Sequence, residues 1–162
     1  MPILTAAMKR MLDEQRLGFV ATVCPDGTPN LSPKGTTTAW DDDHLIFADI
    51  HSPGTVANLR HNPQIEVNVV DPFARKGYRF KGSAKVLTEG PQYDAIVAFY
   101  RQRGSRAVIQ SIVLIQVNQV ASLTSPAYDD GTPEADIRSR WERHYADLQQ
   151  RWATSKDSAS EA

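Results

Sequence analysis

The first part of the chain changes from a helical to an extended pattern of apolar residues. One helix face carries the apolar side chains Leu4, Met8, Met11 and Leu12. Gly18 follows as a helix stop, and residues 19–24 are then rich in β-prone side chains. The turn signal Pro25-Asp26-Gly27 separates this run from a second extended run at residues 29–38. We therefore predict a short amphipathic helix followed by a β-hairpin.

The middle of the chain alternates strands with short helices. The pattern predicts strands at residues 44–50, 65–69, 78–87 and 112–120. A short helix around Val56 ends at Asn62-Pro63, because the residue before a proline is pushed out of the helical region. A longer helix begins at Pro91 and ends at Gly104. This order has too few crossover helices for a doubly wound sheet and favours a mainly β, α+β fold, a small antiparallel barrel with flanking helices.

The C-terminal part of the chain predicts one more helix, over about residues 132–152. Its apolar stripe consists of Ile137, Trp141, Tyr145, Leu148 and Trp152. Such a stripe is usually core packing, and on a terminal helix it can instead cover a partner subunit. Because the last residues are small and polar, we expect residues 154–162 to form a disordered tail and residues 1–153 to form a single domain.

Composition and charge narrow the function classes. The chain has 162 residues, of which 41% are hydrophobic and 23% charged, as in a soluble globular domain. Eighteen Lys and Arg stand against nineteen Asp and Glu, so no global cationic field attracts nucleic acid. The single cysteine, Cys24, cannot form an internal disulfide, and the four histidines lack metal-ligand spacing. We expect a cytoplasmic protein with no membrane segment and no metal site.

One candidate anion site lies at residues 49–56. Ser52 is predicted as the N-cap of a helix and Pro53 as its first residue. This arrangement leaves the amides of Gly54 and Thr55 free at a helix start that follows a strand, where phosphate binds readily. The alternative is an ordinary capped helix.

The second extended run supplies a polar strand face. With a period of two, Ser32, Lys34 and Thr36 point to the same side and place two hydroxyls and an ammonium in a row. The alternative is a solvated edge strand, kept unpaired by Pro33 and charged by Lys34. Together, this face and the helix start could converge on one phosphate from two sides.

A third group of cations lies further along the chain. Aromatic residues interleave with Arg75, Lys76, Arg79 and Lys81. The alternatives are a solvated strand face, an anionic cofactor or substrate, and single-stranded nucleic acid. The acidic balance of the whole chain argues against the last.

Five segments together resemble the pyridoxamine 5'-phosphate oxidase-like family of FMN-binding split barrels, from about Arg16 to Ser122. Their order and spacing are more specific than any one of them. They are residues 17–22, 25–29, 32–35, 51–55 and 58–63.

The resemblance implies a six-stranded Greek-key split barrel that forms a homodimer, with FMN in a groove between the subunits. It places the FMN phosphate on the strand that matches residues 32–36 and on the serine that matches Ser52. Family members commonly have Arg-Lys after that serine, whereas this chain has Pro53-Gly54, which leaves Lys34, with Arg79 or Lys81, to balance the phosphate. The Arg-x-His element of true pyridoxamine phosphate oxidases is absent, so that substrate is not expected.

These observations predict an FMN-dependent oxidoreductase with an unassigned small-molecule redox substrate. The alternatives are a flavin- or haem-binding protein of the same fold without turnover, and a deazaflavin-dependent reductase. No catalytic residue is assigned, since the flavin itself carries the redox chemistry. The expected cofactor-binding residues are Ser32, Pro33, Lys34, Gly35, Thr36, Ser52, Gly54, Thr55, Arg79 and Lys81.

Overall fold

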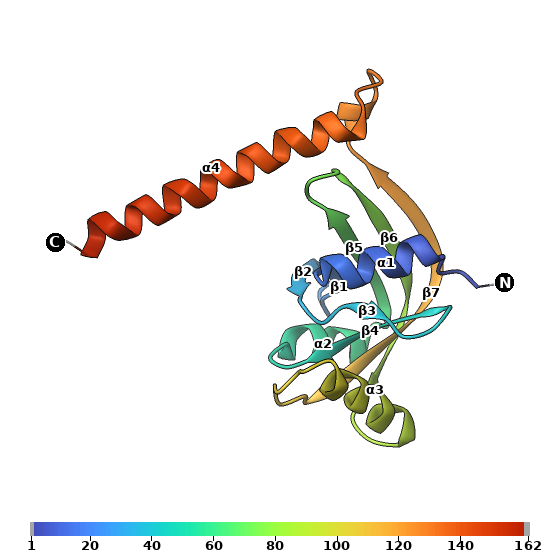
Figure 1. Cartoon of the computed structure of the whole chain (residues 1–162). Coiled ribbons are helices and arrows are strands. Elements are labelled where there is room, and N and C mark those ends of the chain that lie inside the picture. The colour runs from blue at the N-terminus through green and yellow to red at the C-terminus, as the bar shows by residue number, and fades with distance from the viewer. Residues whose placement is uncertain (1, 161–162) are drawn as a thin grey trace. The chain divides into compact units, whose positions relative to one another are not determined.

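A computed structural model of the chain describes residues 2–160, with only the backbone for residues 156–160. The strands are β1 (Gly18–Val23), β2 (Pro29–Lys34), β3 (Thr38–Ala39), β4 (His44–Asp49), β5 (Gln64–Asp71), β6 (Lys76–Leu87) and β7 (Ser111–Thr124). The helices are α1 (Ala6–Gln15), α2 (Pro53–His61), α3 (Pro91–Gln102) and α4 (Glu134–Ser160), with a 3-10 turn at Pro126–Tyr128 (Figure 1). This is the expected α+β split-barrel class.

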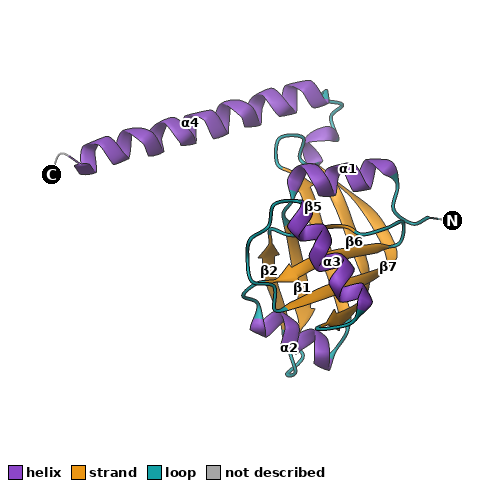
Figure 2. Cartoon of the chain, turned by 60° about the horizontal axis from the view of Figure 1, so that its bottom comes forward, coloured by secondary structure: helices purple, strands orange, loops and turns teal. Residues whose placement is uncertain are grey.

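All seven strands belong to one sheet, in the order β2-β1-β5-β6-β7-β4-β3. The pairs β1–β2, β1–β5, β3–β4 and β4–β7 are antiparallel. A flat sheet of this size would hold its edges about 29 Å apart, at about 4.8 Å per strand spacing. Yet β2 and β3 are joined by residues 35–37 alone, a link that spans about 14 Å at most. The sheet must therefore curl until its two edges approach each other, as Figure 2 shows.

Two groups of buried side chains pack against the curled sheet, one on its inner side and one on its outer side. The larger one lies inside the barrel and includes Val20, Phe47, Val67, Phe80 and Val113. The second packs α3 against the outer side of β4 and β7 and includes Ile46, Ile96, Tyr100, Ile112 and Leu114. Because β4 and the first part of β7 contribute to both groups, residues 45–48 and 112–115 are continuous apolar runs, whereas β5 alternates buried and half-buried residues.

The extended run at residues 29–38 is two strands and not one, which raises the strand count from the predicted six to seven. The chain turns after Lys34, where its carbonyl accepts bonds from the Thr37 amide at 3.4 Å and from the Thr37 hydroxyl at 2.9 Å. Thr36 is consequently a turn residue, and the prediction that it continues the strand face is wrong.

The chain divides into two compact units. The first comprises the residues up to Val69 and Gly77–Ser122, and the second comprises Val70–Lys76 and the chain from Leu123 onward. Helix α4 continues to Ser160, past the predicted end at 152, since no proline or glycine interrupts it. Residues 154–160 therefore have helical backbone where a disordered tail was predicted, and residues 161–162 lie outside the described part.

The second unit is held together by the contacts of α4 with the β5–β6 loop. Arg138 donates to Asp71 at 2.7 Å and Lys76 donates to Glu134 at 2.9 Å. The rings of Phe73 and Tyr145 lie 5.3 Å apart, and the Arg75 guanidinium stacks 4.2 Å above the Trp141 ring. The first half of the predicted aromatic stripe thus packs within this unit, while Leu148 and Trp152 are exposed.

Candidate anion-binding site

The end of β2 presents a lysine to the inside of the sheet. Lys34 is only 7% exposed, and its ammonium donates to the hydroxyl of Ser32 two residues earlier. This confirms that Ser32 and Lys34 share a face. β2 is also an edge strand with an exposed Pro33, but a buried ammonium is not the solvated charge that protects an edge.

The Lys34 ammonium has no close counterion in the described part of the chain. Among the described residues, no carboxylate lies within 4.0 Å of it. Burial lowers the pKa of Lys34, and the Asp49 carboxylate opposes that shift from a greater distance. A buried charge is costly unless it is paired, so this position is suited to an anion that comes from outside the chain.

The start of α2 leaves backbone donors open. Ser52 occupies the N-cap position and Pro53 the first turn, as predicted, but the Ser52 side chain makes no capping bond. The backbone explains this correction, because a ψ of 50° departs from the extended geometry that aims an N-cap side chain at the helix. The amides of Gly54 and Thr55 have no acceptor within the helix, since its first bond runs from the Val56 amide to the Ser52 carbonyl.

Asp49 connects these two halves of the site. It is 4% exposed, and its carboxylate accepts from the Ser52 amide at 2.8 Å and from the Ser111 hydroxyl at 3.1 Å. The same carboxylate is the one that acts on Lys34. One residue earlier, the amide of Ala48 donates to the Thr36 hydroxyl at 2.9 Å. The structure thus brings the β2 end and the α2 start, predicted from separate patterns, into one neighbourhood.

Arg79 and Lys81 lie on the opposite face of the sheet. Phe19 of β1 pairs with Pro33 on one side and with Asn68 on the other, so these three side chains share the outward face. Arg79 bonds Asn68 at 3.4 Å and forms an ion pair with Glu66 at 3.0 Å on that face. Within one chain, therefore, neither Arg79 nor Lys81 lies beside Lys34, in contrast to the expectation that one of them helps to balance the phosphate there.

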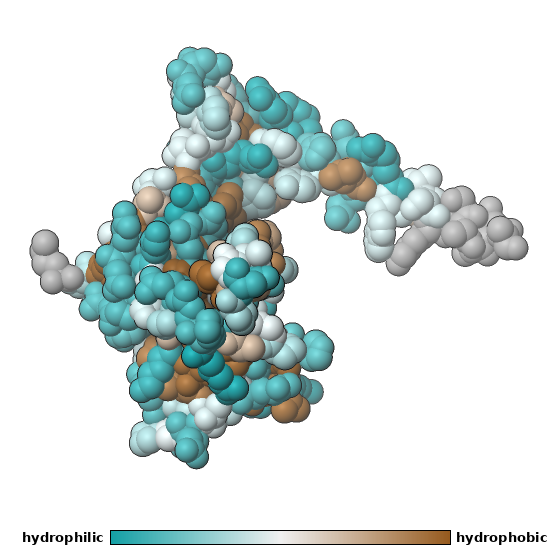
Figure 3. Space-filling model, turned by 180° about the vertical axis from the view of Figure 1, so that it is seen from behind, coloured by the Kyte–Doolittle hydropathy of each residue, from teal (hydrophilic) through white to brown (hydrophobic). Residues whose placement is uncertain are grey.

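The outward face has shallow hollows and apolar side chains of its own. Lys81 lines two of them, of about 360 and 180 Å³, and both also include Glu66. Phe19 is 42% exposed and Leu31 67% exposed on the same side of β1 and β2. Figure 3 shows apolar side chains interrupting a largely hydrophilic surface on the face drawn there. In the sequence, this apolar face is indicated by the alternation of Phe19 and Leu31 with more buried neighbours along β1 and β2.

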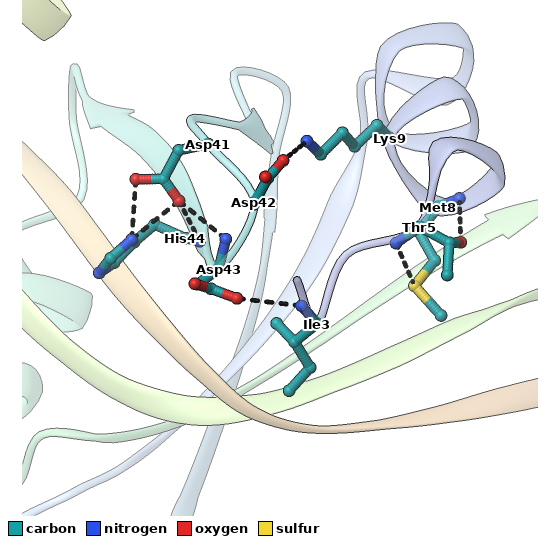
Figure 4. Close-up of polar contacts among 8 residues, drawn as sticks. All are labelled: Ile3, Thr5, Met8, Lys9, Asp41, Asp42, Asp43 and His44. Atoms are coloured by element: carbon teal, nitrogen blue, oxygen red, sulfur yellow. Dashed lines mark hydrogen bonds and ion pairs between the residues drawn. The ribbon is translucent and has the colours of Figure 1, made fainter. Parts of the chain in front are cut away.

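Other polar clusters have structural roles. The turn at residues 41–43 receives the N-terminal segment, where the Ile3 amide donates to Asp43 at 3.0 Å and Lys9 pairs with Asp42 (Figure 4). Asp41 accepts from the His44 ring at 2.9 Å. Among the described residues, no group of three or more His, Cys, Asp or Glu side chains could hold a metal ion. Within the same part of the chain, no helix combines the length and apolarity needed to cross a membrane.

The family profile for pyridoxamine 5'-phosphate oxidase matches residues 4–124. The chain belongs to this family. The match covers the whole barrel and ends at the last residue of β7, so the oxidase profile leaves α4 unmatched. No curated protein matches the chain.

Solved structures agree with the family assignment. HupZ from Group A Streptococcus is 34% identical over 76% of this chain and 96% of its own, with a TM-score of 0.69. An FMN-binding protein from Syntrophomonas wolfei is 16% identical over 73% of this chain and 84% of its own, with a TM-score of 0.62. An F420 reductase is 19% identical over 73% of this chain and 98% of its own, with a TM-score of 0.56. The last two likenesses show the fold alone.

Proposed function

We propose that this protein binds FMN, holds its phosphate at the Lys34 site, and acts as an FMN-dependent oxidoreductase on a small molecule. The observation that carries the proposal is the buried Lys34 ammonium, which has a neutral hydroxyl and, among the residues that the structure describes, no carboxylate at hydrogen-bond distance. A phosphate there would supply the missing charge in a site where charge-assisted bonds are strong.

The residues around Lys34 fit a phosphate. Ser32 adds a hydroxyl, and the amides of Gly54 and Thr55 are open at the start of α2, where the helix dipole favours an anion. The Ser52 hydroxyl is also available, because it does not cap the helix. Pro33, Gly35 and Thr36 would contribute through the backbone that shapes the β2–β3 turn.

Bound FMN would supply the hydride chemistry, and the chain would bind and orient it. In this proposal the cofactor lies between two copies of the chain. Arg79 and Lys81 of the outward face would then meet the flavin or an acidic substrate held by the second copy.

A flavin titration tests the phosphate site. The protein should bind FMN more tightly than riboflavin or FAD, and Lys34→Ala should weaken FMN binding by about tenfold to a hundredfold, as expected for loss of a bond to a charged group. Lys85→Ala, an exposed lysine of β6, is the matched control. Equal affinity for FMN and riboflavin, or an unchanged FMN affinity in a folded Lys34→Ala variant, would contradict the proposal. A visible spectrum of haem or deazaflavin in the purified protein would point to the other cofactor classes.

A further inference from the structure

The turn that follows Lys34 has little backbone support of its own. Residues 35–37 lie between the two edge strands of the sheet, and the one bond across the turn, from the Thr37 amide to the Lys34 carbonyl, is long at 3.4 Å. Gly35 is exposed. The position of the Lys34 end of β2 therefore depends on side chains that bond to this turn.

Three side-chain hydroxyls form the hydrogen bonds that hold this turn. The Thr37 hydroxyl donates to the Lys34 carbonyl at 2.9 Å. The Thr36 hydroxyl accepts from the Ala48 amide at 2.9 Å and donates to the Ala48 carbonyl at 3.3 Å, which ties the turn to β4. The Tyr100 hydroxyl, from α3, donates to the Thr36 carbonyl at 2.8 Å. Of the three, only Tyr100 comes from outside the turn.

Tyr100 is a rigid donor. It is 5% exposed and packs in the apolar group under α3, with the Phe99 ring 5.5 Å away. Burial raises the pKa of its hydroxyl above the ordinary tyrosine range, outweighing the opposing effects of the Thr36 bond and of Arg103. The group thus stays protonated and can donate across the physiological pH range.

We propose that Tyr100 is a positioning residue for the cofactor phosphate: its hydroxyl holds the Thr36 carbonyl and thereby fixes the turn that places Lys34 and Gly35. This inference rests on the proposed function. Since a tyrosine ring fixed in a packed core moves little, the bond fixes the β2 end relative to α3 and to the strands β4 and β7 on which α3 packs. The Tyr100 bond should affect binding of the phosphate and not of the flavin ring, because the proposed function places the turn against the phosphate.

The test compares two hydroxyl deletions on one helix. Tyr100→Phe should weaken FMN binding by about threefold to tenfold, the range for one hydrogen bond, and leave riboflavin binding unchanged. Tyr93→Phe is the matched control, because its hydroxyl also donates from α3 to a backbone carbonyl, that of Ile109 at 3.3 Å, away from the turn. Fluorescence titration of both flavins gives the FMN-to-riboflavin affinity ratio for each variant.

A ratio that falls only in Tyr100→Phe supports the positioning role, whereas a ratio that is unchanged, or falls equally in both variants, overturns it. Amide hydrogen exchange of residues 35–37 in the unliganded protein gives a second readout. Exchange should be faster in Tyr100→Phe than in Tyr93→Phe, and equal rates would overturn the role of Tyr100 in holding the turn. If the wild type binds neither flavin, the proposed function fails, while the exchange comparison still decides whether Tyr100 holds the turn.

Discussion

Lys34 places a positive charge inside the barrel, with a serine hydroxyl at hydrogen-bond distance and no acidic side chain there within the described part of the chain. Its environment also makes the charge sensitive to pH. Burial lowers the pKa of Lys34, and Asp49 only partly opposes this. The ammonium is therefore lost at a lower pH than that of an exposed lysine.

This shift predicts the pH dependence of FMN binding. Because the phosphate needs the protonated ammonium, FMN affinity should begin to fall below the usual lysine pKa of about 10.4 as the pH rises. The stability of the unliganded protein should change in the opposite direction. Between the lowered pKa of folded Lys34 and the usual lysine pKa, the unfolded chain binds more protons than the folded one, so the free energy of unfolding rises with pH. Titrations of FMN and riboflavin from about pH 7 to 10 measure the effect. Parallel curves for the two flavins would show that Lys34 does not contact the phosphate.

The sequence predicted some of these residues and missed others for identifiable reasons. Alternation with a period of two was enough to place Ser32 and Lys34 on one face. Tyr100 reads as one apolar position of a helical stripe, and Asp49 as the end of a strand. The partner of Tyr100 is Thr36, 64 residues away, and Asp49 bonds Ser111, 62 residues away. A local sequence pattern cannot predict contacts over such separations.

At the scale of the elements, the conformation of the β5–β6 loop depends on the carboxylate of Asp71. Asp71 accepts from the amides of Phe73 and Ala74 at 2.8 and 3.0 Å and from Arg138 of α4 at 2.7 Å. Desolvation acts to raise the pKa of Asp71, but the two amide bonds and the guanidinium outweigh it and lower the pKa overall. Asp71 thus orders the loop and attaches α4 to it.

We predict that Asp71→Ala loosens this unit. Loss of a partly buried, charge-assisted acceptor should cost about 1 to 3 kcal/mol in local stability. Because the folded pKa is lowered, the contribution is present above the unfolded value near 3.9 and disappears as the pH falls through the folded value. Urea unfolding followed by tryptophan fluorescence, with Trp141 stacked on Arg75 of the loop, measures it. Asp26→Ala removes a similar carboxylate from an exposed turn and is the control; equal effects of the two changes would contradict this role for Asp71.

Prolines and glycines predict some element boundaries and miss others. Pro91 begins α3, as the sequence indicated, but the predicted stop at Gly18 is wrong: α1 ends at Gln15, Arg16 is its left-handed C-cap, and Gly18 is the first residue of β1. The run at residues 29–38 does contain Gly35 at its turn, but the turn is also held by side-chain bonds to β4 and α3, which the local pattern does not show. The small polar residues after Trp152 predict the end of α4 too early, because none of them is a helix breaker.

At the scale of the whole molecule, the outward face of the barrel is more apolar than a solvated surface requires. Leu31 lies across from Ala21, and Phe19 across from Pro33, so exposed apolar side chains form one patch on β1 and β2. Patches of this kind mark interaction sites. A second copy of the chain is the partner that the proposed shared cofactor site needs.

We predict a homodimer whose contact surface includes this patch. Sedimentation velocity of the FMN-loaded protein should show a dimer, and Leu31→Glu should shift it toward monomer with loss of flavin. Val108→Glu, a change at another exposed apolar residue, should leave the dimer intact. A flavin-saturated wild-type monomer would refute the shared site.

The closure of the barrel through residues 35–37 has a consequence for the handling of the protein. β2 and β3 are both sheet edges, and their unpaired backbone groups can recruit strands from other molecules. In the native protein, the shortness of β3 and the prolines Pro29 and Pro33 in β2 prevent these edges from pairing with other strands. A proteolytic nick or thermal fraying in this turn would release both edges at once. We therefore expect aggregation to begin with opening of this turn, and an anion bound beside it to delay the onset.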